Sequence, residues 1–362
     1  MLKGEGHYFV SPGFLDDLGN FLRVWGHERV LLVTDEHIDS FWHAKITASM
    51  AAFPGEYGVV VLPAGEQSKT PDTVALLHSR LLDLNADRHT AVVALGGGVV
   101  SDVAGLAAST FMRGLPLYLL PTTLLAMVDA SLGGKNGVDL PQGKNLIGTF
   151  YLPRGVWSDL DLLTSLPLRE WSNGLAEALK TALIGDPELF SLLERLDLSS
   201  LAMGEQSTGS PAWCREIVER SARVKGRIVA EDLTECGKRA QLNLGHTLGH
   251  GLEAAVRYQG ISHGEAVALG MLAAVRVAAA RGVLRQPLEN RLTAMLRRWR
   301  LPVRIPASLE WNDVLQALRR DKKRRGQKYT FVLPVDVGEV RLVQLADYGC
   351  LEDVFRSLQD QK

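Results

Sequence analysis

The first half of the chain alternates short apolar runs with amphipathic stretches. Four runs, at residues 30–33, 58–62, 91–95 and 117–120, each end in a turn of glycine, proline, threonine or acidic residues. Short apolar runs that stop at such turns are typical of buried β-strands. Helical patterns such as residues 70–85 lie between them, and this alternation favours a parallel α/β sheet. Ligands of such sheets bind beyond the carboxyl ends of the strands, where these turns cluster.

From about Leu162 onward, long helical patterns replace the short apolar runs. One late strand, Tyr329–Pro334, is expected after a basic run. The change predicts an N-terminal Rossmann-like parallel α/β domain over residues 1–161 and a mostly α-helical domain over residues 162–362. A cleft between the two domains is the default expectation for an active site. The expected helices are Glu170–Leu183, Trp213–Ala230, His246–Arg257, His263–Arg281 and Leu288–Trp299.

Composition is that of an ordinary globular protein. The 362 residues suffice for two cores, and a net charge of −1 provides no overall field for nucleic acid or an anionic membrane. Three widely spaced cysteines predict neither a disulfide framework nor a CxxC zinc site, and they favour a reducing compartment, the cytoplasm. The N-terminus has no signal-peptide pattern. The apolar stretch Ala266–Leu284 carries Arg276 and Arg281, so we expect a buried helix there rather than a membrane span.

The strand that ends at Leu95 continues into Gly96-Gly97-Gly98 and then into the start of a helix. Glycines let a backbone approach phosphate oxygens, and a helix N-terminus favours an anion. Ser101 stands where the dinucleotide-binding pattern has a glycine, so the motif is not a complete GxGxxG. The segment alone leaves two interpretations open: a phosphate-binding turn, or a tight strand-to-helix turn without a ligand.

Two histidines, His246 and His250, stand four apart in a glycine-rich stretch, so a helix would place them on one face. His263 follows shortly after, and upstream Glu177 and Lys180 share a helical face amid apolar neighbours. Imidazole nitrogens with one carboxylate oxygen suit zinc and leave a position for substrate. We therefore predict a metal site. Spacing does not decide which two histidines bind, and the pair at i and i+4 is the simplest choice.

Several cations stand beside glycines or near the histidine segment. Recognition of phosphate and carboxylate groups requires fixed cations of this kind, although each one alone could equally be a solvated surface charge. The basic run at 319–325 could alternatively be a nucleic-acid patch, but the balanced charge and the lack of interleaved aromatics disfavour that. The candidates are Arg113, Lys135, Lys144, Lys225, Lys238, Arg239 and the run at 319–325.

Long motifs over nearly the whole chain resemble the 3-dehydroquinate synthase family of the sugar phosphate cyclase superfamily. The similar segments, in the family's order, are GGGVVSDVAGLAASTFMRG (96–114), PTTLLAMVDASLGGKNGVDLPQGKNLIGTF (121–150), GLAEALK (174–180), LNLGHTLGHGLE (242–253), HGEAVALGM (263–271), RDKK (320–323) and FVLP (331–334). The resemblance implies a carbon–oxygen lyase of the shikimate pathway that converts 3-deoxy-D-arabino-heptulosonate 7-phosphate to 3-dehydroquinate and phosphate. It also implies NAD and a divalent metal, zinc or cobalt, as cofactors, and a cytoplasmic homodimer.

The resemblance further assigns site residues one by one. The metal ligands would be Glu177, His246 and His263, which leaves His250 facing the substrate. Lys144 matches a position between the cofactor and substrate ends. The positions that match substrate contacts are Arg113, Asp129, Lys135, Asn145, Lys180, Lys225, Arg239, Asn243 and one or both of Lys322 and Lys323. The positions that match NAD contacts are Asp35, Glu66, Lys69, Gly97, Gly98, Val99, Asp102, Thr122 and Thr123.

Three departures from the family pattern concern positions beside the expected sites. Ser101 replaces a usual glycine, Asn136 replaces a usual threonine, and Leu233-Thr234 replaces a charged pair. None of them removes a residue assigned to metal or substrate. The mechanism implied by the resemblance is transient hydride removal by NAD, β-elimination of phosphate, hydride return, and ring closure by an intramolecular aldol step.

Three rival functions stay open from sequence alone. The nearest is another sugar phosphate cyclase that makes a cyclitol of the 2-epi-5-epi-valiolone or 2-deoxy-scyllo-inosose type from a substrate without the carboxylate. Lys225, Arg239, His250 and the run at 321–323 favour dehydroquinate synthase over it. An iron-dependent alcohol or glycerol dehydrogenase would show net NAD reduction. A non-catalytic interaction protein would bind neither NAD nor zinc.

Overall fold

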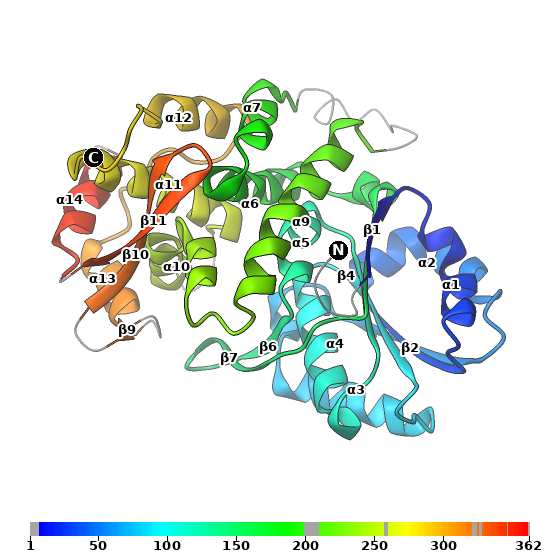
Figure 1. The fold of residues 1–362 in the computed structure, drawn as a ribbon. Helices are drawn as coiled ribbons and strands as arrows, with labels where there is room; N and C mark the ends of the chain where they lie inside the picture. Colours follow the sequence, from blue (N-terminus) through cyan, green and yellow to red (C-terminus); the bar gives the residue numbers. More distant parts are fainter. Residues whose placement is uncertain are drawn as a thin grey trace. The chain divides into compact units, whose positions relative to one another are not determined.

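The computed structural model describes residues 7–198, 210–256, 260–320, 324–325, 328–345 and 347–360. Within these ranges the chain divides into two compact units (Figure 1). One comprises residues 1–167 and 206–222, and the other comprises residues 168–205 and 223–362. The functional domains expected at 1–161 and 162–362 stay a prediction.

The first unit contains a six-stranded parallel sheet with the order β1-β8-β5-β4-β2-β3. The chain runs from β2 outward to β3 and returns on the other side of β2 as β4, so the topological switch lies between β2 and β4. The elements are β1 (His7–Ser11), η1 (Leu15–Asp17), α1 (Leu18–Val24), β2 (Arg29–Asp35), α2 (Glu36–Met50), β3 (Glu56–Leu62), η2 (Glu66–Ser68), α3 (Pro71–Asp83), β4 (Ala91–Gly96), α4 (Gly98–Thr110), η3 (Phe111–Arg113), β5 (Leu117–Pro121), α5 (Leu124–Val128), η4 (Ala130–Leu132), β6 (Lys135–Leu140), β7 (Gly143–Phe150), β8 (Gly155–Asp159) and η5 (Leu160–Ser165).

Helices cover both faces of this sheet because successive strand residues point to opposite sides. In β2, Leu31 and Val33 pack in one core with apolar residues of α3 and α4. Val30 and Leu32 of the same strand pack in a second core with residues of α1 and α2. Both faces are therefore apolar, which explains why the strands are continuous apolar runs in the sequence. The turns after β2, β3, β4 and β5 lie together at the carboxyl edge.

An antiparallel hairpin of β6 and β7 packs on α4. Gly105 of α4 lies against Asn136 of β6, since a Cβ added at Gly105 would sit 1.8 Å from Asn136 Oδ1. The Asn136 amide donates to the carbonyl oxygens of Gly134 (3.1 Å) and Tyr151 (3.0 Å), so it joins the two ends of the hairpin. Asn136, one of the family departures, is thus accommodated by a glycine opposite it.

The second unit is mostly helical, with a short antiparallel sheet of order β11-β10-β9. Helix α9 (Trp213–Glu231) contributes residues to both units. The other elements are α6 (Leu168–Gly185), α7 (Pro187–Arg195), η6 (Lys238–Asn243), α10 (His246–Ala255), α11 (His263–Ala280), α12 (Glu289–Arg298), α13 (Trp311–Arg320), β9 (Arg324–Arg325), β10 (Lys328–Asp336), β11 (Glu339–Leu345) and α14 (Gly349–Leu358).

Helix α11 is the core helix of the second unit. Among the described residues it alone is long and apolar enough to cross a membrane by length and composition, but 72% of its apolar window is buried within the protein. It contacts α6, α10, α12 and α14 as well as β10. The expected buried helix is confirmed.

The expected α/β and helical architecture is confirmed, and the predicted strands and helices agree with the structure to within a few residues at each end. The described part of His246–Arg257 is helical to Ala255, and the expected strand Tyr329–Pro334 lies inside β10. The patterns missed β1, β8, β11 and the β6–β7 hairpin. The hairpin sequence is rich in glycine and polar residues, so neither strand alternates clearly.

We expect Gly105→Ala to lower the free energy of unfolding by about 1–3 kcal/mol, despite the better helix propensity of alanine, because the new methyl group overlaps Asn136. In an Asn136→Ala background, Gly105→Ala should lower the free energy of unfolding by a smaller amount, because the overlapping side chain is gone. Urea unfolding of the two single variants and the double variant measures this coupling. Gly143→Ala, where an added Cβ makes only an ordinary contact with Leu146, is the control. Strictly additive costs would contradict the prediction.

Candidate functional site

Close backbone contacts of glycines set the spacing of α6, α10 and α11. A Cβ at Gly264 of α11 would lie 2.4 Å from Asn173 Cα of α6, and one at Gly270 would lie 1.8 Å from the Gly245 carbonyl oxygen before α10. A side chain at either position would push the helices apart. These contacts bring the start of α11 beside α6 and the start of α10 beside α11.

A capping box fixes where α11 begins. Ser262 Oγ accepts the Glu265 N–H (3.4 Å), while the Ser262 N–H donates to Glu265 Oε2 (2.8 Å). Ser262 Oγ also donates to Asn173 Oδ1 of α6 at 2.6 Å. His263 is therefore the first helical residue of α11 and is anchored next to α6.

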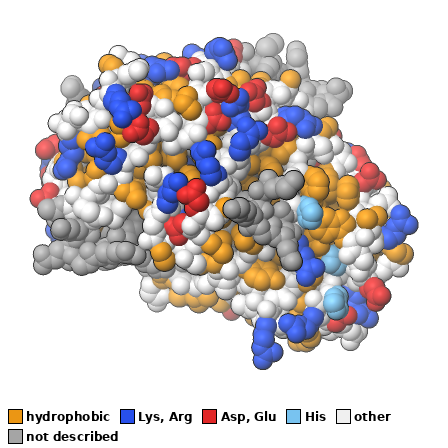
Figure 2. Space-filling view, viewed as in Figure 1, with side chains coloured by type: hydrophobic (Ala, Val, Ile, Leu, Met, Phe, Trp, Pro, Cys, Tyr) orange, Lys and Arg blue, Asp and Glu red, His pale blue; other side chains and the backbone are white. Residues whose placement is uncertain are grey.

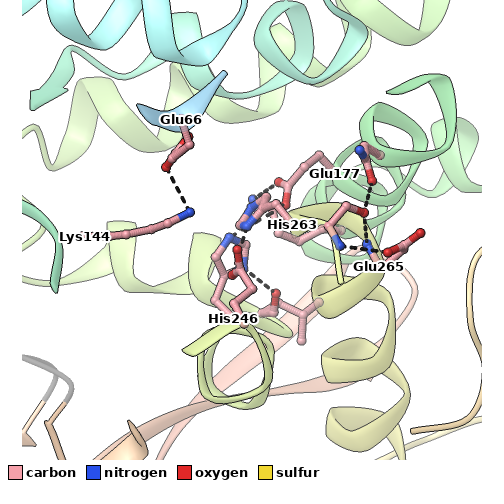
Figure 3. A network of polar contacts seen from close by, with 11 residues as sticks. Glu66, Lys144, Glu177, His246, His263 and Glu265 are labelled. Atoms are coloured by element: carbon pink, nitrogen blue, oxygen red, sulfur yellow. Dashed lines mark hydrogen bonds and ion pairs between the residues drawn. The ribbon is translucent and has the colours of Figure 1, made fainter. Parts of the chain in front are cut away.

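Glu177, His246 and His263 converge from α6, α10 and α11 (Figure 3). Glu177 Oε1 lies 3.4 Å from His263 Nε2 and 3.7 Å from His246 Nε2. Ligand atoms 2.0–2.1 Å from a tetrahedral zinc are about 3.3 Å apart, so the three atoms have nearly the spacing of one coordination sphere. Two imidazoles and a carboxylate are also the donor set of many catalytic zinc sites. The three residues fit a divalent metal without rearrangement of the helices.

The outer nitrogens of both imidazoles have fixed partners. His246 Nδ1 lies 3.1 Å from the Leu244 carbonyl oxygen, and His263 Nδ1 lies 3.3 Å from Glu253 Oε2. A carbonyl or carboxylate accepts a hydrogen bond from Nδ1–H, so Nε2 is the nitrogen that faces Glu177 and, once it has lost its proton, can serve as a metal ligand. This arrangement selects the imidazole tautomer that binds metal.

The local field favours a cation. Glu177 is fully buried, and its carboxylate also forms an ion pair with the buried Lys180 one helical turn later. Burial by itself would lower the pKa of His263, but hydrogen bonds to the Glu177 and Glu253 carboxylates outweigh it and raise that pKa to about 10. The cluster therefore stabilises positive charge at the point where Nε2 of His263 meets Glu177. A metal ion would take the place of that proton.

His250 stands one turn after His246 on α10, and its ring centroid is 5.2 Å from that of His246. It is also part of a second group, with Glu253 and His263, whose potential ligand atoms lie within 4.8 Å of one another. In this second group, Nδ1 of His263 is already engaged by a hydrogen bond with Glu253. In the group of Glu177, His246 and His263, both Nε2 atoms and the carboxylate face one point. Geometry thus favours His246 with His263 over the simple pair at i and i+4.

Three further candidates of the second unit lie on α9 and in the segment before α10. Lys225 and Arg239 are almost fully buried, and Arg239 Nη1 donates to the Leu233 carbonyl oxygen at 2.5 Å. Asn243 Nδ2 donates to Glu235 Oε1 at 2.6 Å. Asp232 accepts hydrogen bonds from the backbone N–H groups of Cys236, Gly237 and Arg239 and so shapes the loop.

Leu233 and Thr234, which depart from the family pattern, have exposed side chains. Lys322 and Lys323 lie outside the described residues.

The NAD candidates of the first unit gather at the carboxyl edge of its sheet. Asp35 ends β2 and caps α2 through Ile38 N, and Thr123 follows β5 and caps α5 through Ala126 N. Glu66 and Lys69 follow β3. Thr122, also after β5, is buried. Gly97 precedes α4, whose first residues include Gly98, Val99, Ser101 and Asp102.

Ion pairs link these candidates to one another. Lys69 Nζ lies 2.6 Å from Asp102 Oδ2, and Lys144 Nζ lies 2.9 Å from Glu66 Oε1 (Figure 3). Burial would lower the pKa of Lys69, but Asp102 outweighs it and raises that pKa, so Lys69 stays charged. Ser101 is buried, and its Oγ has no hydrogen-bond partner within the described ranges. The structure thus gathers the expected cofactor residues around the start of α4, at the switch point of the sheet.

The remaining candidates of the first unit lie at the ends of short helices and in the β6–β7 hairpin. Arg113 is exposed and has a left-handed backbone (φ +67°), and Asp129 ends α5. Lys135 opens β6 with an exposed side chain, and Asn145 of β7 has φ +53°. On the face that Figure 2 shows, basic and acidic side chains are interspersed, so no large field of one sign covers that face.

Two polar residues of the sites were missed from sequence. Glu253, which contacts His263, stands three positions after His250 in the same helix, and the motif LNLGHTLGHGLE ends on it. The available signal was the spacing, because a carboxylate three residues after a histidine on a predicted helix lies on the same face as that histidine. Asp139, whose contacts are described below, has no such helical spacing, because a hairpin brings it to its partner.

Comparisons with known proteins agree with this geometry. A model of the 3-dehydroquinate synthase N-terminal region matches residues 59–173, and one of the C-terminal region matches residues 174–324. A 3-dehydroquinate synthase of Symbiobacterium thermophilum is 43% identical over 345 residues, which cover 94% of each chain.

Two solved structures of cyclitol-forming enzymes are more distant in sequence. The 2-epi-5-epi-valiolone synthase of Streptomyces hygroscopicus subsp. jinggangensis, with NAD+ and Zn2+ bound, is 28% identical with a TM-score of 0.87, over 99% of this chain and 98% of that one. A 2-deoxy-scyllo-inosose synthase in complex with carbaglucose-6-phosphate, NAD+ and Co2+ is 27% identical with a TM-score of 0.83, over 97% and 96%.

The class is that of the sugar phosphate cyclases, whose fold this chain shares with a 28% identical member: a parallel α/β unit and a helical unit, which here carries a Glu/His/His cluster. Both halves of the chain match one family within this class, and the identity to its members is well above that to the cyclitol synthases. The chain belongs to the 3-dehydroquinate synthase family.

We expect Glu253→Gln to weaken zinc binding by about tenfold, because a neutral amide orients His263 less firmly and lowers the basicity of its ring. Competition with a chromophoric chelator measures the zinc Kd. Glu352→Gln is the matched control, since Glu352 lies on α14 and forms an exposed ion pair with Arg356. Equal zinc affinity in the Glu253 variant and the control would contradict the role of Glu253.

Proposed function

We propose that this carbon–oxygen lyase converts 3-deoxy-D-arabino-heptulosonate 7-phosphate to 3-dehydroquinate and phosphate. The observation that carries the proposal is the succession of both family models along residues 59–324, with a relative 43% identical over 94% of the chain. The Glu177, His246 and His263 cluster supports it independently, because it supplies the donor set of a catalytic metal.

NAD and a divalent metal, zinc or cobalt, are the cofactors in this proposal. When bound, NAD supplies a reversible hydride acceptor and the metal supplies a Lewis acid that polarises a substrate oxygen. Glu177, His246 and His263 would hold the metal. The carboxyl edge of the parallel sheet would hold NAD, with the positive end of α4 available for the pyrophosphate. The 2-epi-5-epi-valiolone synthase structure contains NAD+ with Zn2+, and the 2-deoxy-scyllo-inosose synthase complex contains NAD+ with Co2+.

The side chains of this chain position the substrate's anionic ends. We assign Lys135, Lys225 and Arg239 to the phosphate and carboxylate groups, with Asn145 and His250 as further hydrogen-bonding partners. Buried cations such as Lys225 and Arg239 attract an anion more strongly than exposed ones, because water and salt screen them less. Arg113, Asp129, Lys180, Asn243 and the lysine pair at 322–323 complete the assignment.

Little general acid–base chemistry is required of the protein. The departing phosphate serves as its own base in the elimination, and the aldol closure is intramolecular. Rate enhancement then depends mainly on orientation of the substrate and on stabilisation of developing charge. This fits a site that is rich in fixed cations.

The cyclitol synthases are the second candidate function, because two of them share the fold with TM-scores of 0.87 and 0.83. They are only 28% and 27% identical. We further propose a cytoplasmic homodimer. The three cysteines are free, as in a reducing compartment, and dimerisation rests on the family resemblance alone.

Phosphate release from 3-deoxy-D-arabino-heptulosonate 7-phosphate tests the function. We expect release that requires both NAD and metal, stops on chelation, forms dehydroquinate and yields no net NADH. Release from sedoheptulose 7-phosphate or glucose 6-phosphate, with none from the heptulosonate, would instead identify a cyclitol synthase. Net NADH from a simple alcohol would identify a dehydrogenase.

Glu177→Gln should abolish measurable turnover and lower zinc content, because it removes the anionic ligand. It also leaves the buried Lys180 without its carboxylate, which costs about 3–5 kcal/mol of stability. A Glu177→Gln/Lys180→Gln double variant separates the two effects, since it should regain stability but not zinc. Glu170→Gln in the first turn of α6 is the control. A folded Glu177→Gln variant with full activity and normal zinc content would refute the assignment.

A further inference from the structure

Asp139 sits at a β-bulge in the β6–β7 hairpin. Val138 pairs with Ile147 and Leu140 pairs with Gly143, with a shift of register between them at Asp139. Between these pairs β6 has one residue, Asp139, whereas β7 has three, residues 144–146, so the extra residues of the bulge lie on β7 opposite Asp139. Asp139 Oδ1 accepts the backbone N–H of one of them, Asn145, at 2.7 Å.

This hydrogen bond supports an uncommon backbone conformation. Asn145 has φ +53°, in the left-handed region that most residues with a side chain avoid and that asparagine tolerates better than most. The bond from its N–H to Asp139 holds Asn145 in this conformation within β7. Lys144, the preceding residue, is thereby directed to Glu66, with 2.9 Å between Nζ and Oε1 (Figure 3).

Asp139 also ties the hairpin to the segment after β3. Its backbone N–H donates to the Lys69 carbonyl oxygen at 2.9 Å. The Lys69 ammonium group in turn meets Asp102 of α4. A single residue thus contacts, through its side chain, a candidate for substrate binding and, through its backbone, a candidate for NAD binding.

We propose that Asp139 is a positioning residue that holds Asn145 and Lys144 in register with the Glu66–Lys69 segment, and so aligns the substrate end of the site with its cofactor end. Asp139 acts through its neighbours and need not contact either ligand. The proposal rests on the proposed function, because the roles of Asn145, Lys144 and Lys69 come from it. Burial and, to a smaller extent, the Glu66 carboxylate raise the pKa of Asp139, while the Asn145 N–H, Lys69 and Lys144 act in the opposite direction and favour its charged form.

The test compares Asp139→Ala with Asp139→Asn in the holoenzyme. The alanine variant removes the acceptor for the Asn145 N–H, whereas the asparagine side-chain oxygen can still accept it. For Asp139→Ala we expect a rise of about tenfold in KM for the heptulosonate phosphate, with a smaller loss of NAD affinity, as one lost hydrogen bond would cause. For Asp139→Asn both changes should stay within about threefold. Asp83→Ala, on the exposed end of α3, is the control.

Steady-state kinetics give KM and kcat separately, and calorimetric titration with NAD gives a Kd that does not depend on turnover. Wild-type KM and NAD affinity in Asp139→Ala would overturn the proposal, and so would equal losses in the alanine and asparagine variants. If Asp139→Ala does not fold, Asp139→Val, whose side chain also has no acceptor but suits a β-strand, takes its place in the comparison with Asp139→Asn. Failure of the wild-type chain itself to bind NAD or to release phosphate would instead refute the proposed function.

Discussion

Burial of the Glu177 carboxylate is the constraint on which the helical unit depends. A charge with no exposed surface requires positive partners, since its transfer from water costs several kcal/mol. Lys180 supplies one partner from the same helix, and His246 and His263 bring imidazoles from α10 and α11. The three helices must therefore pack closely at this point, and glycines at 264 and 270 make that approach sterically possible. The same electrostatic demand that orders the core brings together the three donor groups that the proposed function assigns to a divalent cation.

The parallel sheet imposes a different constraint on the other unit. Its strands are apolar on both faces, so polar chemistry is confined to the turns at their ends. The turns after β2, β3, β4 and β5 meet at one edge, with the helix start of α4 at the switch point. In the proposed function, backbone geometry at this edge therefore supports the binding of NAD, whereas side chains of the helical unit hold the metal.

Residues behind the sites determine how well these groups are aligned. The Leu244 carbonyl and Glu253 orient the two imidazoles, Ser262 fixes the start of α11, and Asp139 holds the backbone of Asn145 in β7. None of them belongs to the residue set that the family resemblance assigns. Their contacts are short-range and directional, so they depend on a bulge, a cap or a helical turn rather than on residue type alone. A site that contained the same ligand residues without these neighbours would lack this orientation.

The sequence by itself determined the class of fold, because apolar runs with terminal turns and the later helical periodicity are local patterns. It also supplied the candidate ligands and the family, through motifs long enough to be specific. Local pattern did not determine the β6–β7 hairpin, the places of β1 and β8 in the sheet, or the histidine that joins His246 at Glu177. Those features depend on contacts between residues far apart in the chain. Only helix packing sets the distance from His263 to Glu177, and only strand pairing puts Asp139 against Asn145, so tertiary structure alone decided them.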